Sequence, residues 1–175
     1  GSTNGYQLYA VRKADIIVKP GLFSLANPAN NAVVLTSSDD NSDVVINWRK
    51  SANSTRYRWV ADVLGGNYNP GIVSFPSNNS GADTALTLKN SAIDALLASL
   101  GVAEGTEITL KWSVFAYLES DSVKASQDFT ITLRRKLAMK AFNLISPANN
   151  SNVTTEQGSN TQVNISFGDG NGSTY

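Results

Sequence analysis

Acidic side chains are the groups of this sequence best suited to catalysis by proton transfer. A glycoside hydrolase needs two carboxyl groups about 5 to 10 Å apart across a cleft, one of them with a raised pKa. Seven of the chain's 14 acidic residues are candidates, all in turns or near strand ends: Asp39, Asp40, Asp43, Glu104, Glu107, Glu119 and Asp121. Neighbouring serine and asparagine residues indicate solvated turns, and the chain has no histidine and no cysteine. Because the commonest general base and the thiol nucleophile are both missing, we predict a protein that is not an enzyme and uses no cofactor.

Two acidic stretches have the beginning of a cation-binding loop without its end. "DDNSD" places Asp39, Asn41 and Asp43 at alternate positions, as a calcium loop does. Such a loop also requires a glycine at its sixth position and a glutamate at its twelfth. The sixth position here is not glycine, and Lys50 stands at the twelfth. The later stretch "GDGNGS" is similarly incomplete, so we predict no metal site and interpret both as Asx-rich turns.

Aromatic side chains are the third kind of candidate, because a sugar ring can stack on an aromatic face while polar groups bond its hydroxyls. Tyr68 lies in the loop "GGNYNPG", and Phe115 and Tyr117 occupy the outward row of their strand. We predict Tyr68, Phe115 and Tyr117 as a glycan-binding set. An alternative stays open, in which these side chains cover a neighbouring domain or helix.

Four alternating segments predict an all-β fold, a β-sandwich of the immunoglobulin or fibronectin-III type. A period of two places every second side chain on one face of a sheet. The apolar rows are Val44, Ile46 and Trp48; Tyr57, Trp59 and Ala61; Ile108, Leu110, Trp112, Val114 and Ala116; and Phe129, Ile131 and Leu133. Clusters of Asn, Gly, Ser and Pro separate the segments, as turns do in a sandwich. We therefore expect all three tryptophans to face the core.

One inserted segment, "TALTLKNSAIDALLASLGV", changes from strand to helix periodicity. The residues at helical spacing are Ile93, Leu96, Leu97 and Leu100. Ser91 followed by Asp94 resembles a capping box, and Gly101 stands where a glycine ends a helix with positive φ. The sequence thus predicts one short helix, which must lay its leucines across an open edge or end of the sandwich.

The turn sequence that opens the sandwich occurs twice, 119 residues apart. "FSLANPANNAVV" begins at Phe23 and "FNLISPANNSNV" at Phe142. The next apolar row keeps the same offset, with Val163, Ile165 and Phe167 in place of Val44, Ile46 and Trp48. We predict three parts: residues 1–20 as a stalk or the end of a preceding unit, 21–136 as an immunoglobulin-like domain, and 137–175 as an incomplete second unit. An incomplete sandwich exposes unpaired strand edges. As a hypothesis, the segment "YQLYAVRK" near the N-terminus could supply a strand that pairs with the second unit.

Charge and hydropathy argue against two kinds of partner. The chain has 14 basic and 14 acidic residues, with no block of like charge. It therefore lacks the basic footprint expected of a protein that binds nucleic acid or an anionic bilayer. No apolar run approaches the ~20 residues needed to cross a membrane.

The order of these features resembles the N-terminal domain of SusE-type proteins. The features are the "SPANN" turn, a strand ending in tryptophan, and the stretch "LTLKNSAIDALLASLGVAEGTEITLKWSVFAYLESDSVKASQDFTITL". The resemblance covers residues 23–135. It implies a surface-exposed lipoprotein of the outer membrane of Gram-negative Bacteroidetes, anchored by an acylated cysteine that this chain does not contain.

The same resemblance implies binding of a polysaccharide or oligosaccharide, mainly through C-terminal domains absent from this chain, and partnership with a SusC/SusD-type importer. In that family the N-terminal domain acts as a spacer. We therefore expect a non-catalytic spacer and scaffold in a starch-utilisation-like glycan uptake system. Two alternatives stay open: a carbohydrate-binding module in its own right, or a fibronectin-III-like accessory or adhesion domain of a secreted protein.

Overall fold

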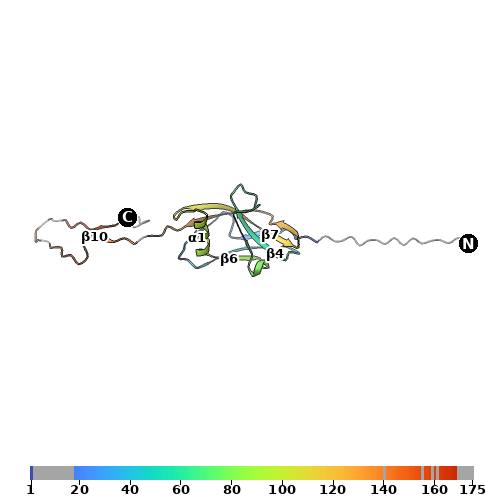
Figure 1. The fold of residues 1–175 in the computed structure, drawn as a ribbon, viewed down its shortest axis with the longest axis horizontal. Helices are drawn as coiled ribbons and strands as arrows, with labels where there is room; N and C mark the ends of the chain where they lie inside the picture. Colours follow the sequence, from blue (N-terminus) through green and yellow to red (C-terminus); the bar gives the residue numbers. More distant parts are fainter. Residues whose placement is uncertain (2–17, 140, 155, 159, 161, 169–175) are drawn as a thin grey trace.

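A β-sandwich with one α-helix, followed by a two-stranded segment, is the fold of this chain (Figure 1). The computed structural model describes residues 1, 18–139, 141–154, 156–158, 160 and 162–168. In chain order the elements are β1 (Leu25–Asn27), β2 (Ala32–Thr36), β3 (Asp43–Trp48), β4 (Arg56–Asp62), β5 (Val73–Pro76), the 3-10 helix η1 (Asn79–Gly81), β6 (Ala85–Lys89), α1 (Asn90–Ser99), β7 (Glu107–Leu118), β8 (Asp121–Lys124), β9 (Phe129–Arg135), β10 (Leu144–Ser146) and β11 (Ser166–Phe167).

Two sheets face each other in the sandwich. The smaller sheet has the order β1-β3-β6, and the larger has the order β2-β9-β7-β4-β5 with β8 paired to β7. The chain changes sheets between β1 and β2, so that β1 pairs antiparallel with β3 while β2 pairs parallel with β9. The protein is thus an all-β, immunoglobulin-like sandwich with one short helix, as the sequence predicts.

The core contains the apolar rows that the alternation predicts. Trp48, Trp59 and Trp112 are buried, with exposed fractions of 4%, 6% and 0%. Their indole N–H groups have no hydrogen-bond partner among the described residues. The tryptophans therefore belong to the interior between the sheets and are not available to stack on a ligand.

Helix α1 ends as predicted but begins differently. Its C-terminus is a Schellman motif: Gly101 has φ +82°, its N–H donates to the Ala98 carbonyl, and the Val102 N–H donates to the Leu97 carbonyl. The predicted capping box is wrong, because the N-cap is Lys89 and no side chain caps it.

Backbone groups of the β2–β3 loop replace the expected cap. The N–H groups of Asn90 and Ser91 donate to the carbonyls of Ser42 and Asp40 over 2.9 and 2.7 Å. The hydroxyl of Ser91 bonds the Asn41 side chain instead of the helix backbone. Contacts with β2 and β6 place the helix against one edge strand of each sheet.

The repeated turn sequence folds the same way in both places. Leu25 pairs with Trp48, and at the 119-residue offset Leu144 pairs with Phe167. The hydrogen bond from the Arg49 N–H to the Ser24 carbonyl recurs from Gly168 to Asn143, at 2.9 Å in both. Residues 142–168 thus reproduce the β1–β3 pairing of the first unit. The boundaries at 20, 136 and 175 stay predictions, and "YQLYAVRK" lies outside the described residues.

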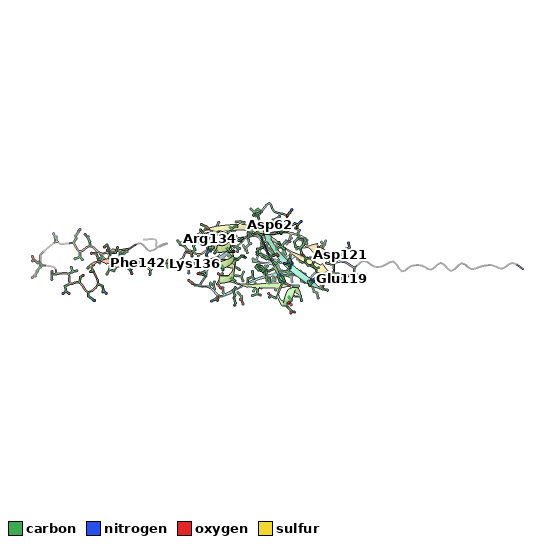
Figure 2. The ribbon with its side chains drawn as sticks, viewed as in Figure 1. Asp62, Glu119, Asp121, Arg134, Lys136 and Phe142 are labelled. Atoms are coloured by element: carbon green, nitrogen blue, oxygen red, sulfur yellow. The ribbon has the colours of Figure 1, made fainter. Side chains whose placement is uncertain are left out.

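The chain enters and leaves the sandwich at opposite ends (Figure 1). Lys19 lies beside Asp121, where β8 begins, whereas the chain leaves after Arg135 on the side of α1. Figure 2 shows Glu119 and Asp121 at one end and Arg134 and Lys136 at the other. In the part of the chain that is described, no helix has the length and apolar character to span a membrane.

Candidate functional site

The three predicted ligand residues meet on the outer face of the larger sheet. The alternation that turns Trp59 and Trp112 inward turns Arg56, Arg58, Phe115 and Tyr117 outward. Strand register then places Arg58 directly opposite Phe115 and Arg56 directly opposite Tyr117 on β4 and β7. This face therefore alternates guanidinium and aromatic groups across neighbouring strands.

Tyr68 reaches the same face because an aspartate folds its loop back over the sheet. Asp62, at the end of β4 (Figure 2), accepts hydrogen bonds from the N–H groups of Val63 and Tyr68, both at 2.8 Å. The Tyr68 ring then lies edge-on to Phe115, with centroids 6.1 Å apart. Asp62 is thus the residue that positions Tyr68.

Two glycines allow this loop to lie against the strand beneath it. A Cβ on Gly66 would come within 2.1 Å of the Asp62 carboxylate, and one on Gly71 within 2.4 Å of the Val60 side chain. Both glycines lie in the connection between β4 and β5, which pair antiparallel on either side of it.

Two neighbouring hollows form the candidate site, which we call the outer groove. The first has a volume of about 210 Å³, and its lining includes Arg58, Tyr68, Ser74, Phe115 and Tyr117. The second has a volume of about 240 Å³, and its lining includes Arg56, Arg58, Ser80 and Tyr117. Because Arg58 and Tyr117 line both, the hollows are adjacent along the sheet.

Two lysines and two aspartates lie around the Tyr68 ring. The Lys111 ammonium lies 4.5 Å from the Tyr68 ring centroid and also donates to the Gly66 carbonyl. Lys124 lies 5.6 Å from the same centroid and is ion-paired with Asp128. Burial, followed by the negative charges of Asp128 and Asp62, raises the pKa of Tyr68. The Tyr68 hydroxyl therefore stays protonated, and it is buried close to the Asp128 carboxylate.

Of the seven candidate carboxylates, only Asp39 and Glu104 line the same hollow among those described, one of about 210 Å³ that also contains Asp94 and Lys136. Asp43, Glu107 and Asp121 form separate ion pairs with Lys89, Arg134 and Lys19. Asp40 bonds the Ser42 N–H in its own turn, which lowers the pKa of Asp40. No group of three acidic, histidine or cysteine side chains suited to a metal ion occurs among the described residues. The absence of enzymatic activity stays a prediction.

Sequence reasoning missed one buried ion pair. Arg135 binds Asp94 through Nε at 3.1 Å and Nη2 at 2.9 Å, and Thr36 also donates to this carboxylate. The hydrogen bond from Arg135, followed by that from Thr36, lowers the pKa of Asp94 against the opposing effect of burial. The available signal was an acidic residue between Ile93 and Leu97 on the apolar side of the helix.

The fold and the groove together define the class of protein: an immunoglobulin-like β-sandwich that carries an aromatic and basic groove on one sheet. A scan against protein-family models found no match to this chain, and a search of curated proteins also found none. The resemblance to SusE-type proteins therefore stays a prediction.

Proposed function

We propose that this chain is a non-catalytic spacer and scaffold of a cell-surface glycan-binding lipoprotein. In this proposal the full-length protein is lipid-anchored to the outer membrane and works beside a SusC/SusD-type importer. One observation carries it: the chain enters and leaves the sandwich at opposite ends, and hydrogen bonds attach both ends to the sandwich.

The N-terminal attachment involves the loop between β3 and β4. The Gly21 N–H donates to the Ala52 carbonyl at 2.9 Å, and the Ser51 hydroxyl donates to the Gly21 carbonyl at 2.6 Å. The Asn53 amide donates to the Lys19 carbonyl at 3.3 Å. These bonds, together with the burial of Pro20, limit the directions in which the chain can arrive.

The C-terminal attachment involves the helix and β2. Arg135 is held by Asp94 and also donates to the Val102 carbonyl at 2.7 Å. The next residue continues the attachment, since the Lys136 N–H donates to the Thr36 carbonyl at 2.8 Å. The link to residues 142–168 therefore starts from a fixed direction.

The length of the spacer follows from β7, which runs from one end of the sandwich to the other. Its 12 residues, at about 3.3 Å per residue, span roughly 40 Å. Stiff units of this length hold distal binding domains away from the membrane and restrict their movement. Restricted movement raises the effective concentration of captured polysaccharide near an importer.

Hydrogen–deuterium exchange of the 175-residue chain tests the proposal at the two ends. We expect the amides of Gly21 and Lys136 to be protected like core amides, because both are bonded to the sandwich. The exposed amide of Asn149 provides an unprotected reference within the same sample. Exchange of Gly21 and Lys136 at the rate of Asn149 would mean freely pivoting ends and would overturn the spacer proposal.

A second candidate function, carbohydrate binding by the sandwich itself, is favoured by the meeting of Tyr68, Phe115 and Tyr117 at one groove. Affinity electrophoresis in gels containing different polysaccharides separates the two functions. A pure spacer migrates without retardation, whereas a binding module is slowed and loses that effect in Tyr117→Ala.

A further inference from the structure

We propose that the outer groove binds an anionic saccharide, with Arg56 and Arg58 bonding its carboxylate or sulfate groups and Tyr117 stacking on a sugar ring. This inference rests on the second candidate function and names the class of ligand. Three observations support it: the charge of the groove, the spacing of the arginines, and the shape of the hollows.

The two arginines carry charge that no acidic side chain in the described part of the chain neutralises. Ion pairs among the described residues engage five other basic side chains: Lys19, Lys89, Lys124, Arg134 and Arg135. Arg58 donates only to the Ser74 hydroxyl, at 3.0 Å, which leaves most of its five N–H groups free. Arg49, Lys50 and Lys136 also form no ion pair among the described residues. What distinguishes the groove is that two such arginines lie two residues apart on one face of β4.

The two acidic groups that act on Tyr68, Asp62 and Asp128, already have partners. Both oxygens of Asp62 accept backbone N–H groups, and Asp128 is paired with Lys124. Neither carboxylate can turn to an arginine without breaking these bonds. Neither carboxylate therefore competes with an anion for Arg56 and Arg58.

The arginines are spaced to hold an extended ligand. Arg56 and Arg58 are two residues apart on β4, so their Cα atoms are separated by about 6 to 7 Å along the strand. Each has an aromatic ring directly opposite on β7, Tyr117 and Phe115 respectively. A guanidinium recognises a planar carboxylate with two parallel hydrogen bonds, while the adjacent ring offers an apolar face for the sugar.

The shape of the groove favours a chain over a compact molecule. Each hollow, at about 210 and 240 Å³, is smaller than the ~300 to 1,000 Å³ of a typical small-molecule pocket. The two share Arg58 and Tyr117, so a linear saccharide can place successive rings in them. Tyr117 is then the ring that both sugars touch.

Affinity electrophoresis tests the inference with three probes: polygalacturonate, a sulfated galactan, and an uncharged galactan. We expect the 175-residue chain to be retarded by one or both anionic polymers and at least tenfold less by the uncharged one. Comparing the two anionic gels decides between carboxylate and sulfate. Raising the salt concentration should weaken the retardation, as expected for a charged contact.

Two variants and one matched control identify the residues. Arg58→Gln should weaken binding to the anionic polymer about tenfold or more, and Tyr117→Ala should weaken it similarly. Arg49→Gln removes the same charge from an exposed residue that directly follows β3 of the other sheet and should leave binding unchanged. Circular dichroism of each variant checks that the sandwich stays folded.

The possible outcomes distinguish the inference of an anionic ligand from the carbohydrate-binding function on which it rests. Equal retardation by charged and uncharged polymers, unaffected by Arg58→Gln, would overturn the anionic ligand and leave carbohydrate binding standing. No retardation by any polymer would overturn both. Equal losses in Arg49→Gln and Arg58→Gln would show unspecific attraction and would also overturn the proposed site.

Discussion

The segments around β1 and β3 and around β10 and β11 have a similar turn sequence, the same strand register and an equivalent hydrogen bond, but they differ in burial. Phe23 and Ile46 are 5% and 4% exposed, while Phe142 and Ile165, their counterparts at the 119-residue offset, are 58% and 66% exposed. The difference shows that the turn and its two strands are determined locally, whereas burial depends on the second sheet and the helix. Only the first region has these neighbours among the described residues.

The largest expected effect comes from truncating the same ring in both regions. Phe23→Ala should lower the free energy of unfolding of the sandwich by about 3 to 5 kcal/mol, because it opens a cavity in the core. Phe142→Ala should change it by less than about 0.5 kcal/mol, as at an exposed position. Urea unfolding followed by tryptophan fluorescence measures both, since all three tryptophans lie in the sandwich core. Equal losses in the two variants would contradict the comparison.

The second-largest effect concerns the ion pair between Asp94 and Arg135, which attaches the end of β9 to helix α1. Asp94→Asn should cost about 3 to 5 kcal/mol, because it leaves Arg135 buried without its counter-charge. Asp43→Asn, which breaks the exposed pair with Lys89, is the matched control and should cost about 0 to 1 kcal/mol. A loss for Asp94→Asn no larger than the control would show that the pair does not hold the helix to β9.

The same pair predicts a pH dependence with a definite sign. The pKa of Asp94 is lowered in the folded protein, so its contribution is present above the pKa of an unfolded aspartate, about 3.9. That contribution is lost as the pH falls through the lower folded pKa. The difference in stability between wild type and Asp94→Asn should therefore be constant from pH 7 to 5 and shrink below pH 4. Urea unfolding at several pH values measures it, and a difference that grew toward acid would contradict the assignment.

The smallest effects distinguish the two ends of α1. Gly101→Ala forces a side chain into the left-handed region and should cost about 1 to 2 kcal/mol, although no atom crowds the new Cβ. Ser91→Ala should cost less than about 0.5 kcal/mol, because the Ser91 hydroxyl does not cap the helix. A loss near 1 kcal/mol for Ser91→Ala, the usual value when an N-cap side chain is removed, would show that Ser91 does cap the helix and would contradict this assignment.

Sequence patterns predicted the parts of the fold that depend on residues close to one another in the sequence. The rows containing Trp48, Trp59 and Trp112 follow from a period of two, and Gly101 follows from the geometry of a helix end. The N-terminus of α1 could not be predicted in this way, since its N–H groups are satisfied by carbonyls of Asp40 and Ser42, about fifty residues earlier.

The residues of the candidate site were likewise predictable only where local alternation determines their position. Outward alternation was enough to select Phe115 and Tyr117. The position of Tyr68 depends on the buried carboxylate of Asp62 and on the close approach at Gly66, which no periodicity reveals. The partner of Asp94 was likewise hidden, because Arg135 lies 41 residues away along the chain.

The stiffness of the sandwich between its two ends is the central claim, and one distance measurement tests it most directly. The chain has no cysteine, so Leu22→Cys and Met139→Cys, both at exposed positions, allow two spin labels to be attached at the ends. Double electron–electron resonance should give one narrow distribution centred on the order of 40 Å, the length of β7. A broad or multiple distribution would contradict the claim, because a unit whose ends pivot cannot fix the distance between the segments joined to those ends.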